Sequence, residues 1–106
     1  MTLTEYFEKH FKPLEVFPQD FNEVIGFVYI YIQGAVRDNC DTLTLTSTDF
    51  ICSKEGQVVD SFYIGNINPD ISFRDALKLI VERDEVIRQH LELVEDSQEK
   101  ITYRLN

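Results

Sequence analysis

The sequence predicts an α+β fold: a mainly antiparallel sheet of about four strands, with a short N-terminal helix and one long helix, in the order α-β-β-β-α-β. The chain has 106 residues, of which 43% are hydrophobic and 27% charged, and this composition is typical of a single soluble domain spanning residues 1–106. Apolar residues recur with helical spacing near the N-terminus and again from residue 73, whereas much of the chain between them is strand-like.

The N-terminal segment predicts a short helix over residues 3–11. Thr2 followed by Glu5 matches a capping box, in which a hydroxyl and a carboxylate satisfy the free amides of the first turn. Pro13 and Pro18 then interrupt helical hydrogen bonding, so the residues after the helix are expected to form a connector.

Residues 23–36 predict a central strand covered on both faces. Beta-branched and aromatic side chains dominate this segment, and almost nothing polar interrupts Val24 to Ile32. Gly26 and Gly34 are expected to mark bulges or bends in that strand.

The next strand begins with alternating threonine and leucine over residues 42–46. This alternation places Leu43 and Leu45 toward the core and the threonines toward water or a helix edge. We expect the strand to continue through residues 50–52, with a bulge around residues 47–49.

A hairpin is expected to follow, with a turn at residues 53–57 and a return strand over residues 58–64. Gly56 is the residue suited to a positive φ in that turn. Residues 101–105 alternate with period two and predict a final strand.

The long helix is predicted over residues 73–96. Ser72 and Asp75 match a second capping box, and the apolar residues behind them share one sector of the helix. Asp84 falls on that apolar sector, which predicts a kink near residues 82–85.

No motif in the sequence indicates catalysis or metal binding. It contains no phosphate-binding glycine loop, nucleophile elbow or calcium loop. His10 and His90 fall at or beside apolar faces, where structural histidines are common, and Cys40 and Cys52 lack partners at zinc-site spacing. We therefore expect reduced structural thiols, no enzyme activity, no cofactor and no metal.

The charge balance excludes several classes of partner. Ten basic residues against 19 acidic ones give a net charge of −9 and a pI near 4.5. Such a surface repels phosphate backbones and anionic lipids, so direct binding to nucleic acid or membrane is not expected. The N-terminal residues lack a basic region followed by an apolar run, so we expect no secretion signal and a cytoplasmic location.

One constellation points to a partner. Between Glu82 and Glu99, seven carboxylates are opposed by only two arginines. On the predicted long helix, four of these carboxylates fall within about 60° of each other, with Val86 and Leu93 beside them as the apolar centre of an interface. The alternatives are a solvated face that only keeps the protein soluble, and a helix buried on two sides. The predicted partner-binding residues are Glu82, Glu85, Val86, Glu92, Leu93, Glu95, Asp96 and Glu99.

These features favour a small acidic inhibitor of the immunity or antitoxin type, which covers the active surface of a basic toxin or nuclease at one-to-one stoichiometry. The alternative is an acidic chaperone or adaptor of the kind that serves secreted proteins, acting as a homodimer. A buried polar cluster with shifted titration would instead favour an enzyme.

Overall fold

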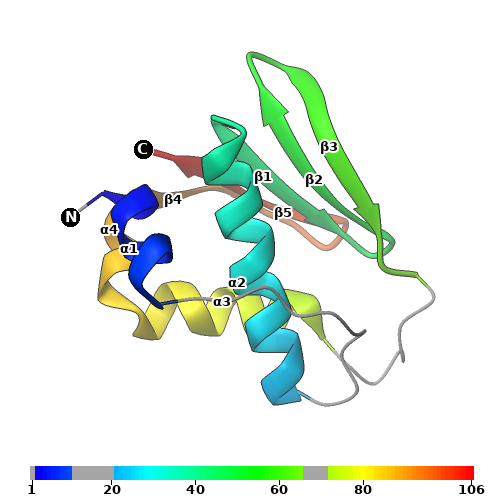
Figure 1. Cartoon of the computed structure of the whole chain (residues 1–106). Helices are drawn as coiled ribbons and strands as arrows, with labels where there is room; N and C mark the ends of the chain where they lie inside the picture. The colour runs from blue at the N-terminus through cyan, green and yellow to red at the C-terminus, as the bar shows by residue number, and fades with distance from the viewer. Residues whose placement is uncertain (1, 11–20, 66–71) are drawn as a thin grey trace.

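The computed structural model describes residues 2–10, 21–65 and 72–106, and these form a five-stranded antiparallel sheet and four helices (Figure 1). The helices are α1 (Leu3–His10), α2 (Phe21–Arg37), α3 (Phe73–Arg83) and α4 (Glu85–His90). The strands are β1 (Thr42–Thr46), β2 (Asp49–Lys54), β3 (Gln57–Tyr63), β4 (Leu91–Asp96) and β5 (Lys100–Leu105). The α+β class is confirmed, with one strand and two helices more than expected.

The sheet has the order β3-β2-β1-β5-β4, so β3 and β4 are its two edges. Figure 1 shows the helices gathered on one side of this sheet. Leu43 and Leu45 of β1 are buried on that side, as predicted, while the threonines of β1 are only partly covered. On the open face the Thr44 hydroxyl lies 3.3 Å from that of Thr102, its neighbour on β5.

The prediction of a central strand at residues 23–36 is wrong, because this segment belongs to α2. Its fully buried residues recur at helical spacing: Val24, Val28, Ile32 and Ala35. Apolar side chains between them are half-buried against the rest of the core, so burial on a broad helix face outweighs the β-propensity of the segment. Gly26 and Gly34 therefore lie inside a helix and mark no bulge.

The expected long helix over residues 73–96 is also wrong beyond its first half. The predicted break is confirmed at Asp84, which separates α3 from α4. After His90 the chain becomes β4, which pairs with β5. Leu91 is the only residue of β4 that is buried in the core. The rest of β4 is therefore held by its hydrogen bonds to β5 rather than by packing of an apolar helix face.

The expected bulge at residues 47–49 is instead a tight turn, which divides the expected strand into β1 and β2. The Thr46 hydroxyl accepts from the backbone amides of Thr48 and Asp49 at 3.2 and 2.9 Å, and β2 then pairs back onto β1. The following turn is confirmed, with Glu55 and Gly56 at φ values of 53° and 80°.

The termini of the remaining elements also follow the sequence. Thr2 caps α1 by accepting from the amide of Glu5 at 3.1 Å, and Ser72 caps α3 in the same way at 3.0 Å. Cys40 and Cys52 are free and buried, and burial raises the pKa of Cys52 to about 12, which leaves its thiol unreactive at neutral pH.

Candidate protein-binding surface

The predicted partner-binding residues do not share one helix face. Glu82 lies in the last turn of α3, Glu85 and Val86 belong to α4, and the others lie on β4 or in the turn after it. The helical ridge expected from the sequence is therefore wrong in geometry. The residues instead follow one edge of the sheet, from the α3–α4 corner along β4 to the β4–β5 turn. We call this set the acidic edge: Glu82, Glu85, Val86, Glu92, Leu93, Glu95, Asp96 and Glu99.

Strand geometry divides the acidic edge between the two faces of the sheet. Glu92 is in register with Arg104 and Glu95 with Thr102, so both carboxylates lie on the open face. Leu93 is opposite Tyr103 and projects toward the helix side. The register shifts between Leu93 and Glu95, which leaves one extra residue in β4 as a bulge.

Three carboxylates of the acidic edge are paired inside the molecule. Asp96 accepts hydrogen bonds from Arg74 and Lys78 of α3, which hold the pKa of its carboxyl below the usual value. Glu92 lies 3.7 Å from the Arg104 guanidinium, measured between Oε2 and Nη1.

The third pair joins Glu95 to Lys100 across the β4–β5 hairpin, with 4.0 Å between Oε1 and Nζ. Such exposed pairs contribute about 0–1 kcal/mol to stability. They nevertheless reduce the excess negative charge that the sequence alone suggests for this edge.

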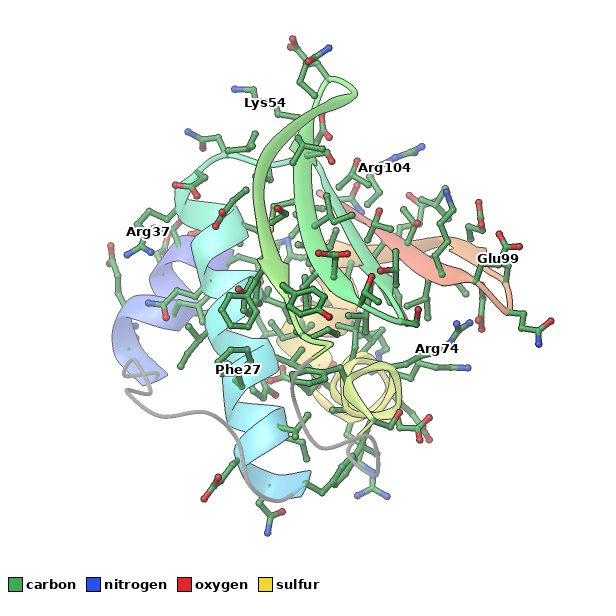
Figure 2. All side chains as sticks on the ribbon, turned by 90° about the vertical axis from the view of Figure 1, so that its right-hand side faces the viewer. Phe27, Arg37, Lys54, Arg74, Glu99 and Arg104 are labelled. Atoms are coloured by element: carbon green, nitrogen blue, oxygen red, sulfur yellow. The ribbon has the colours of Figure 1, made fainter. Side chains whose placement is uncertain are left out.

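Glu82, Glu85 and Glu99 expose their carboxylates to solvent. All three are exposed, and within the described residues none forms an ion pair. Glu82 and Glu85 lie at the start of the edge, whereas Figure 2 shows Glu99 projecting at the far end of the β4–β5 hairpin. The available carboxylates therefore flank β4 at both ends.

Between these charges lies exposed apolar surface. Leu93 and Val94 are 52% and 53% exposed. Val86, which the sequence placed at the centre of the interface, instead packs partly buried against the core. Val94, the extra residue of the β4 bulge, is exposed and takes its place. The outer side of β4 has no strand paired to it among the described residues.

Comparison with protein-family models, curated proteins and solved structures gave no match. Within the described residues no three histidine, cysteine, aspartate or glutamate side chains gather as a metal site. No described helix is both long and apolar enough to cross a membrane.

A second polar cluster centres on Asp84. Its Oδ2 accepts from the hydroxyls of Tyr6 and Tyr29 at 2.5 and 2.6 Å, and its Oδ1 accepts from the amides of Val86 and Ile87 at 3.1 and 3.2 Å. One carboxylate thus connects α1 and α2 to the α3–α4 corner. The sequence marked Asp84 only as a helix break, and no local pattern paired it with either tyrosine.

The titration of this cluster fits a structural role. Burial alone raises the pKa of Asp84, but the hydrogen bonds from Tyr29, Tyr6 and the α4 amides outweigh it and lower the pKa overall. Burial and the Asp84 carboxylate raise the pKa of Tyr6 to about 12 and also raise that of Tyr29. A carboxylate with both oxygens occupied and a lowered pKa is a poor general base. A cavity of about 470 Å³ lies beside it, lined by Tyr29, Arg83 and Asp84 among others.

Proposed function

We propose that this protein is a stoichiometric, protein-binding inhibitor of the immunity or antitoxin type, and that its acidic edge covers the active surface of a basic toxin or nuclease. One observation carries the proposal: exposed Leu93 and Val94 lie on an edge strand with exposed carboxylates at both of its ends. Within the described residues, these end carboxylates (Glu82, Glu85 and Glu99) form no ion pair. An apolar centre with a charged rim is the usual anatomy of a protein interface.

The net charge of −9 supports a basic partner. Complementary fields raise association rates from about 10⁵–10⁶ to as much as 10⁸–10⁹ M⁻¹s⁻¹ at low salt. Affinity then comes from the apolar centre, where a minority of residues carries most of the binding free energy. Leu93 and Val94 are the residues we assign to that centre.

The first test is co-purification of the tagged chain from its own cells, with identification and quantitation of bound proteins. We expect one basic toxin or nuclease at equal molar amount, and loss of its activity when the two purified proteins are mixed. A bound protein with no toxin or nuclease activity contradicts the inhibitor proposal.

The second test locates the surface on the purified pair. Changing Glu82, Glu85 and Glu99 together to lysine is expected to weaken binding at low salt by about a hundred-fold, because complementary charges become repulsive. A matched control changes the exposed Glu8, Asp38 and Glu55 to lysine and alters the net charge equally. Equal losses in the two variants show that only net charge matters and contradict the acidic edge.

A homodimeric chaperone or adaptor is the second candidate, and the opposite edge of the sheet favours it. On β3, Val58 and Tyr63 are 62% and 55% exposed, and this edge also has no described partner strand. Light scattering after size exclusion separates the two candidates. A monomer at micromolar concentration favours the inhibitor, whereas a stable dimer favours the chaperone.

A further inference from the structure

A groove lies between helix α2 and edge strand β3. It encloses about 270 Å³, and its lining includes Phe27 and Tyr31 from α2 and Phe62 from β3. Figure 2 shows Phe27 on α2 beside the end of β3. A Cβ atom added at Gly34, which also lines the groove, would meet nothing within 4 Å, so the helix surface is hollow there.

The floor of this groove is a fixed aromatic cluster. The Phe62 ring centroid lies 5.4 Å from that of Phe27 and 5.3 Å from that of Tyr31. Tyr31 is held in turn by stacking on the fully buried Phe50 at 4.6 Å. Rings supported from below in this way form a preformed apolar site for one side chain.

The backbone of β3 offers hydrogen bonds beside the groove. Ile64 donates its amide to the Thr48 carbonyl at 2.7 Å, toward the β2 side. Backbone groups alternate in direction along a strand, so the amides of Ser61 and Tyr63 point outward, away from β2. No described strand pairs with them.

Strand addition here would fill the groove with a side chain. Phe62 projects toward the helix side of the sheet and Ser61 toward the open face, because side chains alternate along the strand. A residue paired opposite Phe62 on an added strand therefore projects over the groove. The register shift of β3 between Val58 and Asp60 limits regular pairing to the part of the strand from Asp60 onward.

The charge at the groove indicates which segment fits. Asp60 lines it, is exposed, and forms no ion pair within the described residues. Arg37 also lines it, at the end of α2. On an added strand, the residue opposite Asp60 lies two positions from the apolar anchor and on the same face. A basic side chain there would pair with Asp60, whereas an acidic one would face it unfavourably.

We propose that this groove binds an extended segment of a partner protein, which adds to β3 as a sixth strand, places an apolar side chain against Phe27, Tyr31 and Phe62, and sets a lysine or arginine beside Asp60. This site lies on the opposite edge from the acidic edge and does not depend on the inhibitor proposal.

The test measures binding of a short, capped peptide to the full chain, by calorimetry. Valine and lysine take turns at every second position of this peptide, with serine between them, so that a valine opposite Phe62 places a lysine opposite Asp60 on the same face. Ser61→Pro is expected to abolish binding, because it removes an outward amide while leaving the pairing of β3 with β2 intact. Phe62, whose amide points inward, is left unchanged in every variant.

Two further variants keep the test informative if Ser61→Pro unfolds. Gly34→Leu fills the hollow from the helix and is expected to weaken binding at least about ten-fold. Asp60→Lys is expected to lower the affinity for the lysine peptide by about ten-fold. It is also expected to raise the affinity for a matched peptide with glutamate in place of lysine. The control Glu5→Lys carries the same charge change on the exposed surface of α1, outside both proposed binding surfaces, and is expected to stay within about two-fold of the original chain.

Three outcomes overturn the proposal. One is equal weakening by Asp60→Lys and Glu5→Lys, which assigns peptide binding to net charge alone. Another is undiminished binding to folded Ser61→Pro or Gly34→Leu. The last is a concentration-dependent dimer of the unmodified chain that Ser61→Pro abolishes, which assigns the edge to a second copy. The first two outcomes leave the toxin-binding test unaffected, because that test changes Glu82, Glu85 and Glu99. The third outcome also favours the homodimeric chaperone over the inhibitor.

Discussion

The two edge strands of the sheet, β4 and β3, expose different kinds of side chain to solvent. Strand β4 carries three carboxylates in six residues, and all three are paired to arginines or lysines of the same molecule. Strand β3 carries one charge in seven residues, Asp60, and borders an aromatic groove. Charged side chains and bulges are common protections of an edge strand, and both are present on β4. The β4 edge therefore presents charged side chains to solvent, whereas the β3 edge presents an apolar groove and unpaired backbone groups among the described residues.

The largest effect on this contrast is expected from Asp84→Ala, because Asp84 supports the corner that leads into β4. The change removes the cap of α4 and leaves the hydroxyls of Tyr6 and Tyr29 without their acceptor. We expect a loss of about 3 kcal/mol in unfolding free energy, measured by urea denaturation. Hydrogen exchange should rise in α4 and β4 more than in β3.

The exposed Asp75 of α3 provides the control, and Asp75→Ala is expected to cost less than about 1 kcal/mol. A similar cost for the two substitutions would show that Asp84 does not connect the helices in solution.

The pH dependence of stability tests the same cluster from both ends of the scale. The folded pKa of Asp84 is lowered from 3.8, so its contribution is present above pH 3.8 and is lost as the pH falls further. The folded pKa of Tyr6 is raised from 10.0 to about 12, so its contribution is present below pH 10 and is lost as the pH rises toward 12. Tm measured across pH should fall in both windows, and Tyr6→Phe should reduce the alkaline fall.

The smallest effect on stability is expected from Arg104→Ala, which sharpens the charge selectivity of β4. It breaks the exposed pair with Glu92 and should cost less than about 1 kcal/mol. The freed carboxylate should speed association with the basic partner, measured by stopped flow at low salt. Lys54→Ala, at the end of β2, changes the net charge equally and should give a smaller increase. The reverse ranking would exclude Glu92 from the contact surface.

Local chemistry explains which parts of this fold the sequence predicts. Thr2 and Ser72 act within three residues of their partners, and Gly56 acts through its own φ, so these features are visible in a short window. The alternation that buries Leu43 and Leu45 is equally local. The helix break at Asp84 is predictable because a carboxylate cannot continue an apolar stripe.

Distant partners explain what the sequence leaves undetermined. The apolar segment from Val24 to Ile32 is compatible with either a buried strand or a buried helix. Its packing against α1, α3 and the sheet, which a local window does not show, decides in favour of the helix. Strand β4 needs β5, which follows later in the chain. The acidic content of the candidate surface is evident from composition, but its neutralisation by Arg74 comes from a helix 22 positions away.

The order of the strands also constrains how the molecule is made. Strand β1 pairs with β2 on one side and with β5 on the other, and Leu43 of β1 is in register with Tyr103. During translation, strands β1, β2 and β3 are synthesised before β5, which pairs with the other side of β1. The backbone groups of β1 that face β5 therefore have no strand partner until β5 has been synthesised. Nascent chains that stall before this point expose an unpaired edge of β1, and we expect chaperones and proteases to recognise them.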